Sequence, residues 1–217
     1  MHLLAAVTFV AFAQTKLAST ARCPQAPYAA AAPGSSGAGA VRCPALEVTG
    51  RIDRAAPVLD PAFDVAVSVV EFAQSAPAAP NALLTGYAAD GRQLFAVPLA
   101  AAGQFRMLVP LAPAVLNELS RLRLASGGSF VERTAYPHGE PAVEVISVDD
   151  AHVLIAWNGQ HFPGLNVREY GSGALIGAGS GESTYEQLTV SSTAPQLVLE
   201  FSDGVHSFSR TVHVFGR

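Results

Sequence analysis

Apolar and polar residues alternate along most of the chain beyond residue 44. The first such runs are ALEVTGRI, residues 45–52, and DVAVSVVEF, residues 64–72. Successive side chains of a β-strand point to opposite faces of a sheet, so a period of two predicts strands with one buried face. Further runs of this kind before residue 135 are LLTGYA, QLFAVPL, QFRMLVPL, SRLRLA and SFVERT. We therefore expect a first β-sandwich over residues 45–135, with about seven strands.

Short glycine-containing segments separate these runs. ADGR, residues 89–92, and SGG, residues 126–128, predict hairpin turns, because glycine adopts a positive φ at little steric cost. APAVLNELSR, residues 112–121, has leucines three residues apart and can form one helical turn. It is too short for an independent helix, and we interpret it as a crossing between strands.

A second alternating series follows AYPHGEP, residues 135–141, whose prolines and glycine indicate a joint between two independently unfolding units. Its runs are AVEVISV, HVLIAW, LNVREY, ALIGA, YEQLTV, QLVLEF and SFSRTVHVF. This spacing is typical of an all-β sandwich, so we expect the second sandwich over residues 141–217.

The strand HVLIAW contains the only tryptophan of the chain. Alternation places Val153, Ile155 and Trp157 on one face, so Trp157 is expected to fill the core between the sheets. An exposed platform that stacks on a sugar ring is the alternative.

The chain closes on a predicted hairpin, residues 196–217. Asp203 and Gly204 are expected at its turn, because this pair favours the positive φ of tight hairpins. We expect Val198 and Phe208 to face the core of the second sandwich.

The first residues have the character of an export signal. LLAAVTFVAFA, residues 3–13, is an apolar run of signal-peptide length that ends in small residues suited to cleavage. The run is too short to span a bilayer, so no stable membrane span is expected. No Lys or Arg precedes it, and a poorly chosen start codon is the alternative. We take residues 1–13 as a signal peptide and expect a secreted, cell-surface or periplasmic protein.

Residues 14–44 form a flexible tether in this interpretation. Ala, Pro, Gly and Ser predominate between residues 24 and 42, which leaves little apolar surface to bury. Cys23 and Cys43, the only two cysteines, each stand in an Arg-Cys-Pro sequence. In an exported protein an even number of cysteines favours a disulfide, so we expect Cys23 and Cys43 to be bridged. Two unpaired thiols in a linker are the alternative.

The charge of the chain argues against a nucleic-acid partner. Lys and Arg number 13 against 17 Asp and Glu, which gives a formal net charge of −4. The basic residues are almost all arginines, and they form no stripe of the kind that contacts phosphates.

No motif in the sequence carries a recognisable chemistry. The six histidines never stand one helical turn apart as in the H-E-x-x-H motif of metalloproteases; His206 is expected beside the last turn and His213 to face solvent. GSSGA and AGSGE each lack one glycine of the nucleophile elbow of serine hydrolases. Asp149 and Asp150 form the densest carboxylate pair, expected to cap a turn, with calcium binding as the alternative. We expect no catalytic residue, no cofactor and no metal site.

Residues 141–215 resemble a fibronectin type III or immunoglobulin-like module. The likeness is carried by an opening proline, by VLIAW with its tryptophan on the second strand, by LNVREY as the third strand and by LVLEFSDGVHSFSRTVHV as the closing hairpin. Upstream, TGYAADGRQLFAVPL followed by FRMLVPL is similar to the non-catalytic C-terminal regions of large secreted bacterial proteins, some of them peptidases. The resemblance implies an accessory role and brings no catalytic residue with it.

The expected fold class is all-β, with two tandem immunoglobulin/fibronectin III-like β-sandwiches after an N-terminal signal and a flexible linker. The expected function is that of a non-enzymatic secreted module, acting as a spacer, adhesion or protein-binding unit, with an extracellular protein or a polysaccharide as partner. Two alternatives belong to other classes. One is a hydrolase whose site forms from scattered residues across the joint, or an accessory domain of a secreted hydrolase or peptidase. The other is a carbohydrate-binding module.

Overall fold

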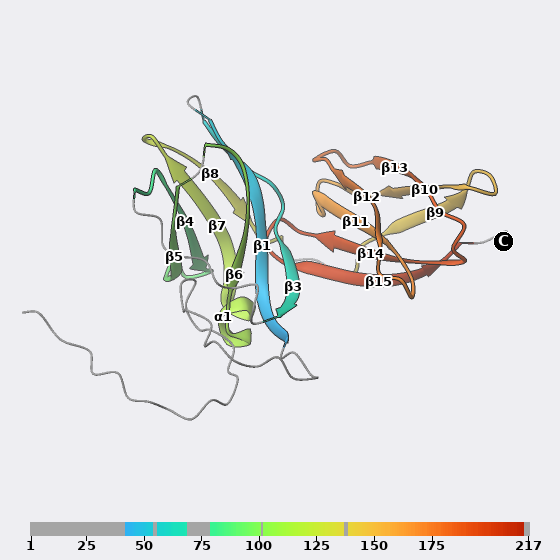
Figure 1. Ribbon diagram of the computed structural model, residues 1–217, viewed down its shortest axis with the longest axis horizontal. Helices are drawn as coiled ribbons and strands as arrows, with labels where there is room; N and C mark the ends of the chain where they lie inside the picture. Colours follow the sequence, from blue (N-terminus) through green and yellow to red (C-terminus); the bar gives the residue numbers. More distant parts are fainter. Residues whose placement is uncertain (1–41, 54–55, 69–78, 101, 137–138, 215–217) are drawn as a thin grey trace, which may run out of the picture.

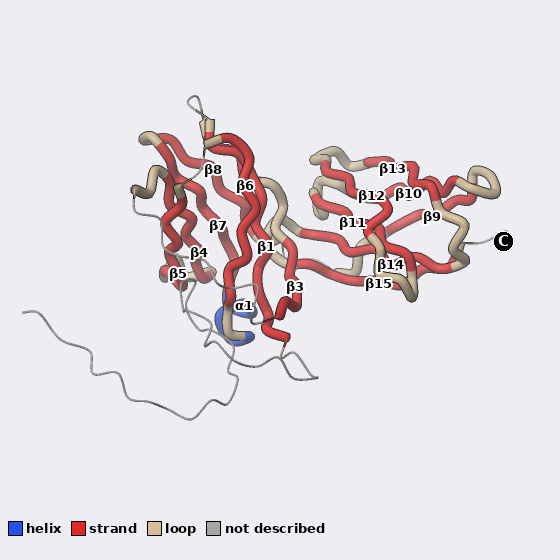
Figure 2. The backbone as a smooth tube through the Cα atoms, in the orientation of Figure 1, coloured by secondary structure: helices blue, strands red, loops and turns tan. Residues whose placement is uncertain are grey.

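The computed structural model describes residues 42–53, 56–68, 79–100, 102–136 and 139–214. These residues form antiparallel sheets, which are grouped into two units along the long axis of the molecule (Figure 1). Figure 2 shows that strands dominate both units and that a short helix lies at one end of the first. The all-β fold class predicted from the alternation is confirmed.

The first unit packs two four-stranded sheets against each other. In one sheet β1 (Arg42–Ile52) is central; β6 (Gly103–Pro110) pairs with one edge, while β2 (Pro57–Leu59) and β3 (Phe63–Ser68) share the other. The second sheet has the order β5-β4-β7-β8, made of β5 (Gln93–Leu99), β4 (Ala82–Ala88), β7 (Leu119–Ser126) and β8 (Ser129–Thr134). The helix α1 (Pro113–Glu118) connects β6 to β7, where the sequence predicts a crossing.

The core of this unit lies between its two sheets. Leu46 and Val48 of β1 are fully buried there, together with leucines of β4 and β7. Gly50 continues this inward-facing row without a side chain, because the Phe105 ring of β6 lies over it. A Cβ at Gly50 would come within 2.9 Å of a ring carbon of Phe105 and within 2.3 Å of the carbonyl oxygen of Val58. Glycine is therefore required at this point of β1.

Seven strands among the described residues form the second unit, which agrees with the predicted number. One sheet has the order β9-β10-β13, made of β9 (Val143–Ser147), β10 (His152–Trp157) and β13 (Glu186–Ser191). The other has the order β12-β11-β14-β15, made of β12 (Leu175–Ser180), β11 (Gly164–Glu169), β14 (Gln196–Ser202) and β15 (Ser207–His213). Trp157 lies in the core between them, as expected: it is 3% exposed, and its indole N–H donates to the carbonyl oxygen of Phe162 at 2.9 Å.

The last five strands of each unit are arranged alike. Four of them form one four-stranded sheet, and the remaining one, β6 or β13, pairs in the facing sheet. The facing sheets differ in the order in which the chain builds them. The second unit begins at the edge strand β9 and then forms the central β10, whereas the first begins with the central β1 and adds the edges β2 and β3 afterwards. Alternation identifies strands without identifying their neighbours, so the sequence does not predict this difference.

The predicted boundary between tether and first sandwich is corrected by β1. This strand begins at Arg42, so residues 42–44 belong to the sheet, where Cys43 pairs with Val67 and Pro44 with Ala66. Pairing with β3 extends the strand beyond the alternating run. Residues 1–41, with the predicted signal peptide, the rest of the tether and Cys23, lie outside the described residues. Cys43 is fully buried, and its bridge to Cys23 stays a prediction.

The closing hairpin differs from the prediction in which side chains face the core. The fully buried apolar residues of β14 are Leu197, Leu199 and Phe201. Val198 therefore lies on the opposite face and is only half-buried, so the prediction for this residue was wrong. Apolar residues stand next to one another at the start of this strand, and alternation does not define which set faces inward. Phe208 is 36% exposed rather than enclosed, although its ring meets the Phe162 ring edge-on with centroids 5.7 Å apart.

Candidate functional site

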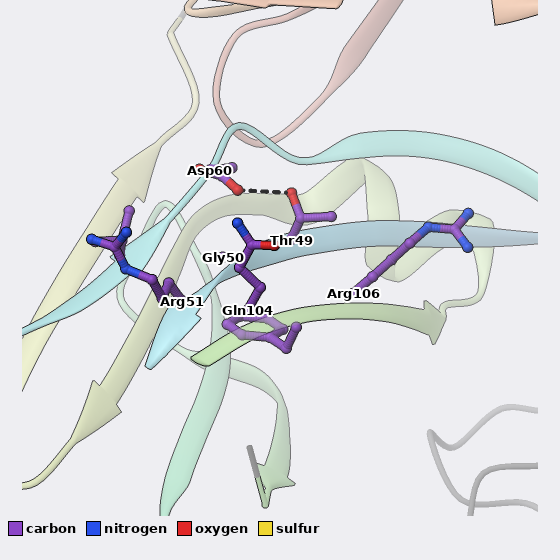
Figure 3. Close-up of a pocket in the computed structure, with 8 residues that line it drawn as sticks. Thr49, Gly50, Arg51, Asp60, Gln104 and Arg106 are labelled. Atoms are coloured by element: carbon purple, nitrogen blue, oxygen red, sulfur yellow. Dashed lines mark hydrogen bonds between the residues drawn. The ribbon is translucent and has the colours of Figure 1, made fainter. Parts of the chain in front are cut away.

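A hollow of about 540 Å³ lies on the first unit, where β1, β2 and β6 run together (Figure 3). Its lining residues are Thr49, Gly50, Arg51, Val58, Asp60, Gln104, Phe105 and Arg106. Figure 3 shows Thr49 and Asp60 pointing toward one another, and the Thr49 hydroxyl donates to the Asp60 carboxylate at 3.0 Å. Arg51 and Arg106 extend to opposite sides of the hollow.

The arginines of this hollow are paired with nearby carboxylates. Nε of Arg51 lies 2.6 Å from the Asp53 carboxylate, and Nε of Arg106 lies 2.5 Å from that of Glu47. Such solvent-exposed ion pairs contribute about 0–1 kcal/mol each. Both arginines of the lining are therefore held in weak, exposed ion pairs.

The outer face of the β5-β4-β7-β8 sheet carries two exposed apolar side chains, Leu83 at 42% and Phe130 at 55% exposure. The Arg123 guanidinium carbon lies 3.8 Å from the centroid of the Phe130 ring, a cation–π contact. Nε of Arg123 also lies 3.8 Å from the Glu132 carboxylate. Aromatic and arginine side chains side by side are typical of protein-contact surfaces.

Side chains from both units converge at the turn between β14 and β15. Gly204 has a φ of +106°, so the turn stands at Asp203 and Gly204 as predicted. The Asp203 carboxylate accepts hydrogen bonds from the backbone N–H groups of Val205 at 2.9 Å and of His206 at 2.8 Å. Val205, at the tip of the turn, is fully buried in the core of the first unit.

Hydrogen bonds fasten this turn to the first unit. The N–H of Ala62 donates to the carbonyl oxygen of Gly204 at 3.2 Å, and the Ser202 hydroxyl donates to the carbonyl oxygen of Ala62. Nε2 of His206 lies 2.6 Å from the carbonyl oxygen of Leu119. A carbonyl only accepts, so this ring nitrogen carries the hydrogen. The predicted closing turn is thus also an interface between the two units.

Asp64, on β3 of the first unit, is hydrogen-bonded to Ser207 of the second. The N–H of Asp64 donates to the Ser207 hydroxyl at 3.0 Å, and the N–H of Ser207 donates to Oδ2 of Asp64 at 3.1 Å. Oδ1 of Asp64 is buried without a hydrogen-bond partner among the described residues. Burial raises the pKa of the Asp64 carboxyl above its ordinary value, against the opposing effects of the Ser207 N–H and of His206.

A further set of contacts also bridges the units. Nε of Arg133, on β8, donates to the carbonyl oxygen of Leu59 at 2.9 Å, and a terminal nitrogen of the same side chain donates to Glu182 of the second unit at 2.5 Å. The rings of Tyr136 and His161 stack with centroids 4.7 Å apart. Arg133, Tyr136 and Glu182 border a cleft of about 290 Å³, where they make these bridging contacts.

Asp149 caps a turn, which is the role expected of it. Its Oδ1 accepts from the backbone N–H groups of Ala151 at 2.7 Å and of His152 at 2.8 Å, and the His152 ring lies at 2.9 Å. The Ala151 N–H is the main reason why the pKa of the Asp149 carboxyl is lowered. His213, expected to face solvent, is exposed on β15.

No family model matches the chain, and no curated protein matches it significantly. Within the described ranges, no three His, Cys, Asp or Glu side chains are grouped so that they can hold a metal ion. In the same part of the chain, no helix is long and apolar enough to cross a membrane. Hydrogen bonds, an ion pair and a shared core residue join the two units at their junction.

Sequence reasoning missed most of the junction. It placed His206 beside the turn and did not single out Ala62, Asp64 or Val205. One signal was present: the turn sequence SDGVHS has an apolar valine at its tip, where glycine and polar residues predominate in exposed hairpins. A valine in that position indicates that the turn packs against another surface.

Proposed function

We propose that the protein is a non-enzymatic spacer that holds two β-sandwiches in a fixed relative orientation outside the cell. One observation carries this proposal. Val205 belongs to the closing hairpin of the second unit, yet its side chain is fully buried in the core of the first. Moving the units apart exposes this side chain and leaves a cavity in the first core, which costs a few kcal/mol. The orientation of the two units is therefore part of the folded state.

The strand order supports a finer class for the second unit, that of a fibronectin type III-like sandwich. A three-stranded sheet faces a four-stranded sheet, and β13 crosses from β12 back to pair with β10. Connections of this Greek-key kind are found in most β-sandwiches. The resemblance of residues 141–215 points to the same class. Proteins of one such fold have many different functions. The proposed spacer function therefore rests on the buried Val205 side chain and not on the fold class.

The extracellular setting is supported by the sequence alone. The apolar run of residues 3–13 has the length of a signal peptide, and the even number of cysteines suits an oxidising compartment. A spacer of this kind separates other domains or surfaces at a set distance.

Distances between spin labels test the spacer. Ala96 on β5 and Ala178 on β12 are exposed and lie one in each unit. Labels attached there through a noncanonical amino acid leave both cysteines unchanged. We expect one narrow distance distribution, because the shared core fixes the orientation. Val205→Asp places a charge where the core is apolar, and the distribution should broaden.

Val148→Asp is the matched control, because Val148 is exposed on the second unit and the same substitution should leave the distribution narrow. Circular dichroism establishes that both variants keep their strands. A broad distribution in the unsubstituted protein would contradict the spacer. So would an equally narrow one in a folded Val205→Asp variant.

A further inference from the structure

We propose that Asp64, His206 and Ser207 form a pH-sensitive clasp that holds the two units together more tightly at acidic than at neutral pH. The inference rests on the proposed spacer function, because it concerns the regulation of the same junction. It adds that the rigidity of the spacer changes with the acidity of its surroundings.

The clasp joins two segments that are distant in the chain. Asp64 and Ser207 exchange hydrogen bonds between backbone N–H groups and side-chain oxygens, and 143 residues separate them. Both bonds lie in a partly buried interface, next to the turn whose Val205 tip fills the first core. A change at Asp64 therefore acts directly on the contact that fixes the units.

The Asp64 carboxylate is poorly satisfied when it is ionised. Oδ2 accepts from the Ser207 N–H, but Oδ1 is buried without a partner among the described residues. An ionised carboxylate that leaves water needs hydrogen bonds to both oxygens, and burial otherwise favours its neutral form. The neutral acid keeps the bond from Ser207 and avoids an unsolvated charge.

Among the residues that the structure describes, two titratable groups act on Asp64, and both come from the turn. Nδ1 of His206 lies 3.9 Å from Oδ2, and a positive charge on that ring favours the ionised carboxylate. Asp203 opposes this effect with its negative charge. The strand partner of Asp64 on β1 is Leu46, which does not titrate. Burial is the largest influence, and it raises the pKa of Asp64.

The direction of the pH effect follows from this raised pKa. A carboxyl that binds its proton more tightly in the docked state than in water stabilises docking fully below its pKa in water. That stabilisation is lost as the pH rises through the pKa of the docked state. The junction is therefore tightest at acidic pH, and ionisation of Asp64 loosens it above the ordinary aspartate range.

Two measurements on the full chain test the clasp. A carbon-13 NMR titration of the Asp64 carboxyl should have its midpoint above the ordinary aspartate value. Thermal unfolding should show a melting temperature that falls more steeply between about pH 4 and about pH 7 in the unsubstituted protein than in Asp64→Asn. The asparagine keeps an oxygen for the Ser207 N–H but cannot ionise. At neutral pH we expect Asp64→Asn to melt about 2–4 °C higher.

Asp60→Asn is the matched control, because Asp60 is an exposed aspartate of the same unit that bonds to Thr49, and it should keep the pH dependence of the unsubstituted protein. A midpoint at or below the ordinary aspartate value overturns the clasp, even if Asp64→Asn fails to fold. Equal pH dependence in Asp64→Asn and in the unsubstituted protein overturns it as well. If either of these results comes with a narrow distribution of spin-label distances, the clasp is overturned and the spacer proposal stands. Broad distributions at every pH overturn the spacer and the clasp together.

Discussion

Nε2 of His206 lies 2.6 Å from the carbonyl oxygen of Leu119, although the two residues belong to different β-sandwiches and are 87 positions apart. Leu119 is the first residue of β7 and is buried in the same core as Val205, the neighbour of His206. The two units therefore share part of one core. The proline-rich joint favours two separate unfolding transitions, whereas the shared core predicts a single cooperative one.

Removing the tip of the turn should destabilise the unit to which it does not belong. Val205→Ala deletes two methyl groups from the first core and should cost about 2 kcal/mol, from about 0.8 kcal/mol per group and a cavity. Hydrogen exchange should rise in β4 and β7 of the first unit. Val214→Ala is the control, because Val214 is buried in the core of the second unit and should affect that unit first. Unchanged exchange in β4 and β7 would show that the tip does not support the first core.

Gly204→Val should destabilise the protein through backbone strain and through the junction. A β-branched residue at a φ of +106° costs about 1–3 kcal/mol. The substitution also displaces the carbonyl oxygen that accepts from Ala62. Gly173→Val is the control, since Gly173 has a φ of +69° in a turn where an added Cβ meets no atom within 4 Å. Urea unfolding should show a larger decrease in the free energy of unfolding for Gly204→Val than for Gly173→Val. Equal decreases would mean that backbone strain accounts for the whole effect.

His206→Ala should weaken the junction because it leaves the carbonyl oxygen of Leu119 without the ring donor. Loss of a partner for a buried backbone group costs about 1–3 kcal/mol. His213→Ala, at an exposed position of β15, should change the free energy of unfolding by less than about 0.5 kcal/mol. Chemical denaturation of both variants measures the difference. A destabilisation by His206→Ala no greater than that of His213→Ala would contradict the bond.

Arg133 and Glu182 should contribute unequally to the junction. The Glu182 side chain is 69% exposed, so Glu182→Gln should cost about 0.5 kcal/mol or less. Arg133→Ala should cost more, because the carbonyl oxygen of Leu59 loses a donor. A double-mutant cycle isolates the ion pair. A coupling energy of several kcal/mol would mean that the pair is more strongly desolvated than its exposure indicates.

The sequence by itself determined the fold class and most of the strands. Alternating runs identified both series of strands and the central position of Trp157, because the side-chain period of a strand depends only on local backbone geometry. The turn at Asp203 and Gly204 was predictable for the same reason, since glycine at a positive φ is a local requirement.

The limits of the pattern appear at Val198 and at β1. Val198 stands among apolar neighbours, so alternation did not define its face, and packing of Leu197 and Leu199 inward decided it. Because it pairs with β3, the strand β1 begins at Arg42, three residues before the alternating run. Both outcomes depend on a second strand, which a local pattern does not contain.

Only the tertiary structure decided where the junction lies. The valine at the tip of SDGVHS indicates that the turn packs against some surface. Nothing in the sequence identifies that surface as the one around Ala62, Asp64 and Leu119. The turn and this surface meet because the closing hairpin of one sandwich reaches the core of the other, across 143 residues in the case of Asp64 and Ser207. Contacts at such separation are set by the shapes of two packed units and by the burial that they achieve together.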